Sequence, residues 1–224
     1  SDLIDQNEQW VLRRYLQRGV GVTVMSPPCT PYGRFSSINK FNARGAWLES
    51  YERCRPLALL CGEVALFQLR RGRGFLNESP AGSKLYHASP WKQVAERPGV
   101  VYDMADQCMA GLQSSRGLPQ RKRTELWASC QTLLRYVAMF QCDGEHEHDT
   151  IEGKEETSRA RLWPWALAVA IANGITDYLS EVARKEVEAG RPVRLSRSCG
   201  FFFRQQLGTG HGGRPGSSCA CSRA

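Results

Sequence analysis

The sequence has no acidic residue after Glu188, no long uninterrupted apolar run and no even number of cysteines, with nine in 224 residues. Its longest apolar stretch, 162–175, is interrupted by Pro164 and Asn173. It is too short to cross a bilayer, so we expect a buried helix and no membrane partner. The polar, acidic opening residues 1–8 are unlike a signal peptide. These features predict an intracellular protein, nuclear or cytoplasmic, with reduced thiols.

The charge balance is basic. Thirty lysines and arginines stand against 22 acidic residues, for a formal net charge of +8. Such a balance favours a polyanionic partner, nucleic acid above all, although a solvated basic surface without a partner has the same composition. The segment 191–224 is rich in Gly, Ser and Arg and predicts a disordered basic tail.

Strand-like and helix-like segments alternate along the chain. Short apolar or β-branched runs predict strands at 20–25, 75–77 and 100–103. Helical periodicity predicts helices at 3–17, at 46–70 with a kink or break at Pro56, and at 91–96. The segment 124–140 has a mixed strand or helix pattern. This rhythm predicts an α/β fold with a Rossmann-like parallel sheet, whose functional loops leave the carboxyl ends of the strands.

The C-terminal part predicts a helical extension. An apolar helix at 161–173 ends at Asn173-Gly174, and a second, charged helix follows at 178–189. We therefore divide the chain into an α/β domain at 1–178, a charged helix at 179–190 and the basic tail at 191–224.

The first predicted strand runs into Ser26-Pro27-Pro28-Cys29-Thr30-Pro31. Three prolines in five positions exclude helix and sheet and predict a stiff loop. Such a loop would hold Cys29 in place and in reach, as a catalytic thiol requires, and Arg34 and Lys40 are near in sequence to supply positive charge. An ordinary buried cysteine is the alternative.

Carboxylates follow the next two predicted strands. Glu78 opens the predicted loop Glu78-Ser79-Pro80 and would face the same sheet edge as Cys29 if the two strands are neighbours. It could then protonate or hydrogen-bond a nucleobase, whereas a surface loop acid is the simpler interpretation of Glu78 alone. Asp103 and Asp106, after the third strand, could bind a base or the Cys29 loop, or could be structural.

Three motifs, in the same order, resemble those of cytosine-5 DNA methyltransferases. Pro28-Cys29-Thr30, followed by an aromatic residue and Ser36, is similar to the Pro-Cys nucleophile loop of that family. FLNESP at 75–80 resembles its strand ending in Glu-Asn-Val. GLPQRKRT at 117–124 resembles its Gly-Val-Pro-Gln segment, which opens the Gln-x-Arg-x-Arg motif. The resemblance covers residues 20–128.

The resemblance implies roles for particular residues. Cys29 would attack C6 of a cytosine flipped out of the stack, Glu78 would engage N3 and the exocyclic amine, and Lys122 would help to position the base or a phosphate. It also implies S-adenosylmethionine as methyl donor and DNA rather than RNA as substrate. Further contacts with the nucleic acid are expected from Ser36, Arg121 and Arg123.

Two departures from the family pattern bear on activity. Thr124 stands where the second Arg of the basic motif is expected, and nothing ahead of Cys29 resembles the aromatic-x-Gly-x-Gly cofactor loop. We therefore expect a partial methyltransferase-like domain whose sheet lacks its first strands. Another chain or polyprotein segment would supply the cofactor half, or the protein would be inactive.

A second resemblance suggests a different role. Ser-Pro-Pro-Cys, Glu-Ser-Pro and a later Cys…His-x-His are similar to segments of retroelement-type polyproteins of protists. This resemblance implies an alternative function, a noncatalytic nucleic-acid-binding module of a mobile-element protein.

Cys142, His146 and His148 lie within seven positions and could bind zinc. The spacing matches no standard zinc finger, and an acidic loop with exposed histidines is the alternative. His-x-His cannot share one face of a helix but can do so in an extended chain. A zinc-stabilised structural module is thus a further hypothesis. A tetrahedral site would take its fourth ligand from Cys130, Cys108 or Asp149.

Overall fold

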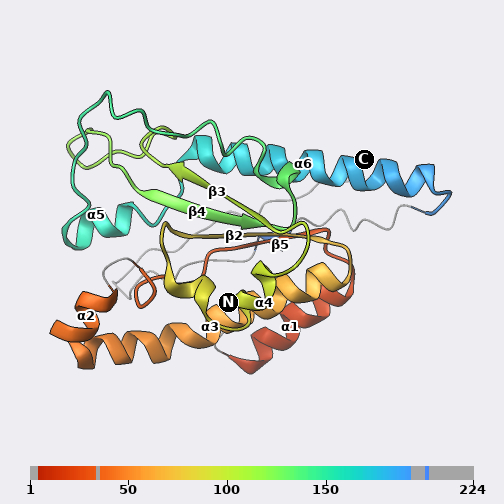
Figure 1. The fold of residues 1–224 in the computed structure, drawn as a ribbon, viewed down its shortest axis with the longest axis horizontal. Helices are drawn as coiled ribbons and strands as arrows, with labels where there is room; N and C mark the ends of the chain where they lie inside the picture. The colour runs from red at the N-terminus through yellow and green to blue at the C-terminus, as the bar shows by residue number, and fades with distance from the viewer. Residues whose placement is uncertain (1–4, 34–35, 193–199, 202–224) are drawn as a thin grey trace, which may run out of the picture.

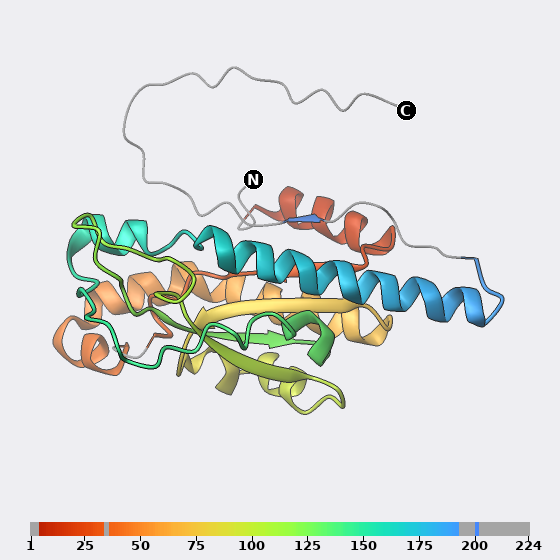
Figure 2. The ribbon, with the colours of Figure 1, turned by 90° about the horizontal axis from the view of Figure 1, so that it is seen from above.

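The computed structural model describes residues 5–33, 36–192 and 200–201, so nearly all of the predicted basic tail lies outside the described residues. The fold is mixed α/β, as predicted. A central sheet carries helices on both faces (Figures 1 and 2). Within the described residues, no helix combines the length and the apolarity needed to cross a membrane.

The sheet is mixed rather than parallel. Its strand order is β3-β4-β2-β1-β5, and the strands are β1 (Val22–Met25), β2 (Gly74–Pro80), β3 (Val101–Asp106), β4 (Arg123–Ala128) and the two-residue β5 (Gly200–Phe201). β1 runs parallel to β2 and to β5, but β4 is antiparallel to both β2 and β3. The prediction of a parallel sheet is therefore wrong for the strands β2, β4 and β3, because β4 inserts between β2 and β3 with reversed direction.

The helices below the sheet in Figure 1 are α1 (Gln6–Gln17), α2 (Ser36–Asn42), α3 (Arg44–Arg70), the 3₁₀ helix η1 (Lys84–His87) and α4 (Trp91–Ala95). One core cluster joins side chains of α1, α3 and α4 to Phe75 of β2. The predicted break at Pro56 is absent, since α3 continues through it. Pro56 is exposed, so water can satisfy the backbone carbonyl that a proline leaves without a donor.

The opposite face carries the 3₁₀ helix η2 (Gln131–Leu134) and α6 (Trp165–Glu188), with α5 (Gly153–Arg159) beside them (Figure 1). The two predicted C-terminal helices are one. A Cβ at position 174 would lie 2.6 Å from the Leu133 carbonyl oxygen. Gly174 does not mark a helix end, since it lies inside α6. It instead lets α6 pack closely on η2. The predicted boundary at 178/179 falls inside α6, where Tyr178 and Leu179 pack against the core.

β2 extends further than predicted. Glu78, Ser79 and Pro80 form its end rather than a loop, and Glu78 pairs with Leu126 of β4. Because β2 is an interior strand with both faces covered, the Glu78 side chain is buried, with 3% of the residue exposed. A carboxylate so placed needs polar partners, which come from neighbouring loops and strands.

Candidate functional site

Cys29 lies on the loop that leaves the carboxyl end of β1, as predicted from its prolines. Its carbonyl oxygen accepts hydrogen bonds from the backbone N–H groups of Tyr32 and Gly33, both at 2.9 Å. Tyr32 is buried, and its own carbonyl accepts from the N–H of Lys84 in η1 at 2.8 Å. These contacts fasten the loop to the fold and leave Cys29 half-buried.

The Glu78 carboxylate is held by three side chains. Ser26 Oγ donates to one carboxylate oxygen at 2.6 Å, and Thr124 Oγ1 donates to the other at 3.1 Å. Lys122 Nζ lies 3.5 Å from the latter oxygen. Gln107 Nε2 donates to Thr124 Oγ1 at 2.8 Å, which leaves the Thr124 hydroxyl proton to point at Glu78. The carboxylate is therefore oriented by contacts from two separate segments, the β1 loop and residues 122–124.

Electrostatics connect Cys29 with this carboxylate. Burial raises the pKa of the Cys29 thiol, the negative charge of Glu78 raises the pKa further, and Lys122 acts in the opposite direction. The pairing of β1 with β2 places the Cys29 loop beside the end of β2, where Lys122 contacts Glu78, so the three residues to which the resemblance assigns catalytic roles lie in one region. Because its pKa is raised, the Cys29 thiol is protonated at neutral pH when no substrate is bound.

The residues predicted to contact nucleic acid differ in how exposed they are. Ser36 is buried at the start of α2, so its side chain is not on the surface that a phosphate contact requires. Arg121 and Arg123 lie 3.2 and 3.9 Å from Asp106, with 41% and 50% of their side chains exposed. Arg34 lies outside the described residues, and Lys40 sits over the Trp47 ring.

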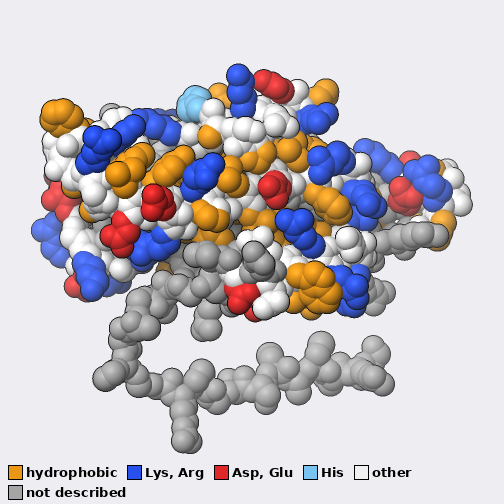
Figure 3. Space-filling view, turned by 90° about the horizontal axis from the view of Figure 1, so that it is seen from below, with side chains coloured by type: hydrophobic (Ala, Val, Ile, Leu, Met, Phe, Trp, Pro, Cys, Tyr) orange, Lys and Arg blue, Asp and Glu red, His pale blue; other side chains and the backbone are white. Residues whose placement is uncertain are grey.

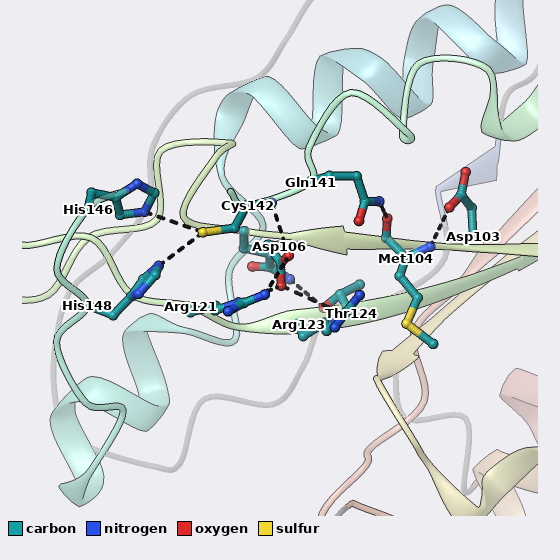
Figure 4. A network of polar contacts seen from close by, with 11 residues as sticks. Asp103, Met104, Asp106, Arg121, Arg123, Thr124, Gln141, Cys142, His146 and His148 are labelled. Carbon is teal, nitrogen blue, oxygen red and sulfur yellow. Dashed lines mark hydrogen bonds and ion pairs between the residues drawn. The ribbon is translucent and has the colours of Figure 1, made fainter. Parts of the chain in front are cut away.

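Asp106 links the basic segment to a second side-chain cluster (Figure 4). Besides Arg121, its carboxylate accepts from the backbone N–H of Cys142 at 3.1 Å. These contacts favour a structural role, one of the two interpretations that the sequence left open. Asp103 takes no part, since its carboxylate accepts from the N–H of Met104 at 2.8 Å.

Four donor atoms meet in that cluster. Cys142 Sγ lies 3.4 Å from His148 Nε2 and 3.8 Å from His146 Nε2, and Figure 4 shows both imidazoles turned toward the sulfur. With Cys108, the ligand atoms all lie within 4.8 Å of one another and could hold a metal ion. Of the three candidate fourth ligands, the structure selects Cys108. Asp149 instead pairs with Arg116, and Cys130 packs against the core.

Three residues of the site were not predicted as such. Ser26 opens the proline loop, and its hydroxyl is the donor nearest to Glu78. Thr124 was noted only as a departure from the family pattern, yet it holds Glu78. Gln107 carries no motif of its own. Their signal is tertiary, because the pairing of β1 with β2 brings Ser26 beside the carboxylate, and the pairing of β4 with β2 and β3 places Thr124 and Gln107.

Among the described residues, the structure gives no support for an S-adenosylmethionine site beside Cys29. A pocket opens between α1 and α3, lined among others by Leu16, Gln17 and Arg70. Those residues precede β1 and β2, whereas Cys29 follows β1, so the pocket lies toward the opposite ends of the strands.

A scan against protein-family models, a search of curated proteins and a search of solved structures found no match. Indications of function come from the geometry of two side-chain groups. One is Cys29, Glu78 and Lys122, which we call the catalytic triplet after the roles that the resemblance implies for them. The other is the Cys/His cluster, by which we mean Cys108, Cys142, His146 and His148.

Proposed function

We propose that this chain carries the base-engaging part of a cytosine-5 nucleic-acid methyltransferase-like site. The supporting observation is that the catalytic triplet comes from the β1 loop, the end of β2 and the residue before β4, where strand pairing and an ion pair gather these segments. The three residues belong to separate motifs, and their meeting needs a particular strand pairing. Neighbouring β1 and β2 ends supply it.

The chemistry needs a thiol and an acid on the same base. C5 of cytosine becomes nucleophilic only after a thiolate adds at C6, and that addition moves electron density onto N3. Cys29 Sγ would form the bond to C6, and the proton of the thiol would pass by way of the Glu78 carboxylate to N3, so that no charge builds up on the ring. Lys122, beside Glu78, would favour the thiolate form of Cys29 during the attack.

The substrate proposed is a cytosine flipped out of DNA, as the resemblance implies. A base in a stacked duplex cannot reach a half-buried sulfur or a buried carboxylate. The half-exposed Arg121 and Arg123 flank Lys122 and would meet the phosphates. On the face shown in Figure 3, by contrast, the described lysines and arginines are interspersed with acidic and hydrophobic side chains. The methyl donor would be bound by another chain or polyprotein segment that supplies the cofactor half.

A cofactor-independent trap tests the proposal. An oligonucleotide with pyrimidin-2-one in place of cytosine accepts a thiol at C6 and a proton at C5, with no leaving group and no methyl transfer. We expect the full chain to form a covalent band with this probe on a denaturing gel. Peptide mapping should place the adduct on Cys29.

Matched variants make the trap decisive. Cys29→Ala should abolish the band and Glu78→Gln should slow its formation at least tenfold, whereas Cys130→Ser, at another half-buried cysteine, should leave it unchanged. The proposal would be wrong if the covalent band still formed with Cys29→Ala, or if the unaltered chain formed no band at any probe concentration.

One observation favours a second candidate, a noncatalytic nucleic-acid-binding module. Activated cysteine nucleophiles have lowered pKa values, whereas the pKa of Cys29 is raised by burial and Glu78. This candidate predicts salt-dependent DNA binding that Cys29→Ala leaves intact. Arg121→Gln should weaken that binding, and Arg97→Gln, at an exposed arginine near α4, should do so less. Binding that is equally insensitive to both arginine changes would argue against it.

A further inference from the structure

The spacing of the Cys/His cluster matches a tetrahedral metal. Zinc binds cysteine sulfur at about 2.3 Å and histidine nitrogen at about 2.0–2.1 Å, so the edges of its ligand tetrahedron measure about 3.4–3.8 Å. The two measured edges from Cys142 Sγ, 3.4 and 3.8 Å, fall in that range. The remaining separations are at most 4.8 Å and would close by at most about 1.4 Å on metal binding.

The backbone around the cluster is shaped to bring the ligands together. The Asp143 carboxylate accepts from the N–H of Glu145 at 3.0 Å, and Gly144 has a φ of +84° that favours glycine. This turn reverses the chain after Cys142. A second bend follows at His146, and the imidazoles of His146 and His148 both face the sulfur (Figure 4).

The part of the chain that the cluster joins lacks a core of its own. None of residues 141–159 is buried, and α5 contributes no buried side chain. Polar contacts connect this segment to the loop 111–122, such as that from Gln120 Nε2 to a Glu156 carboxylate oxygen at 2.8 Å. Segments without an apolar core generally depend on a metal or a disulfide for a fixed conformation.

We propose that Cys108, Cys142, His146 and His148 bind one zinc ion as a closed structural site. Two thiolates and two imidazoles suit zinc better than the hard cations, which take oxygen ligands. Four protein ligands leave no open position for water, so the ion is structural rather than catalytic. The site clips the loop 141–149 to the end of β3.

The zinc site also supports the catalytic triplet, through residues that lie between the two. Gln107, next to the ligand Cys108, donates to Thr124, which in turn donates to Glu78. Asp106 on the other side contacts the N–H of Cys142 and the Arg121 guanidinium. Zinc therefore fixes the residues that orient Glu78 without touching the substrate. The zinc site rests on its own donor geometry and stands whether or not the base-engaging function does.

Metal analysis of the full chain tests the proposal. The protein is expressed with added zinc and purified with a non-chelating phosphine reductant. We expect one zinc per chain by mass spectrometry, and protection of Cys108 and Cys142, but not Cys130, from alkylation. Replacement by Co²⁺ should give the intense visible bands of a tetrahedral ion together with a thiolate charge-transfer band.

The variants separate this site from adventitious binding. The double change His146→Ala with His148→Ala should lower the zinc content at least tenfold, while His87→Ala, at an exposed histidine in η1, should retain it. If the double variant does not fold, the Co²⁺ spectrum of the unaltered chain decides. A metal-free folded chain, an octahedral Co²⁺ spectrum or a Cys108–Cys142 disulfide under reductant would overturn the proposal.

Discussion

The catalytic triplet and the Cys/His cluster are joined through Gln107 and Thr124, but they are built in opposite ways. The triplet stands on strand ends whose neighbours are core residues, such as the fully buried Leu76 and Leu126. The cluster stands on loops, and its segment 141–159 buries no residue. Core packing therefore positions the first group, whereas the ligand bonds themselves would position the second.

The largest effect should come from the core beneath the triplet. Leu126→Ala, at a fully buried position of β4, should lower the free energy of unfolding by about 2–5 kcal/mol, because the cavity adds to the lost burial. Urea denaturation measures this. Leu118→Ala, in the exposed loop beside the cluster, should stay within about 0.5 kcal/mol. Equal losses would erase the contrast between the two regions.

Metal removal should act on the other region. A site saturated at about 1,000 times its Kd stabilises the native state by about 4 kcal/mol, which a chelator removes. Because that segment has no core, we expect amide exchange at residues 107–122 and 141–149 to accelerate at least tenfold. Exchange in β1 and β2 should change little. Uniform acceleration across the sheet would show that the two regions share one source of stability.

The link between the regions should have a smaller effect. Thr124→Val removes the hydroxyl that donates to Glu78 and accepts from Gln107, leaving buried polar groups without a partner. We expect a loss of about 1–3 kcal/mol in thermal unfolding. Thr157→Ala, at an exposed position of α5, provides the control and should be near neutral. A neutral Thr124→Val would show that Glu78 is held without it.

The smallest effect concerns the reactivity of Cys29. Glu78 raises the pKa of its thiol, so Glu78→Gln should lower that pKa and increase the thiolate fraction at a given pH. Lys122→Met should do the reverse. A change of half a pKa unit corresponds to about threefold in iodoacetamide labelling below the pKa. Rates followed by peptide mapping at pH 7 and 8 should rise with pH, and the two variants should bracket the unaltered chain.

Local patterns were sufficient for much of the fold. The strands near 22–25, 74–80 and 101–106 and the helices α1, α3 and α4 lie where apolar periodicity places them. The errors have physical reasons. Pro56 is tolerated because it faces solvent, and Gly174 serves a close helix contact rather than a helix end. β4 was missed because its segment carried no clear period, and its antiparallel insertion is a matter of pairing between distant strands.

The sequence by itself determined which residues are candidates for chemistry, since proline rigidity places Cys29 on a loop and Cys142, His146 and His148 lie within seven positions. Only the tertiary structure decided which of them meet. The choice of Cys108 over Cys130 and Asp149, and the grip of Ser26 and Thr124 on Glu78, depend on strand pairing. Local propensities act over a few residues, whereas strand order is set by burying both faces of one sheet at once.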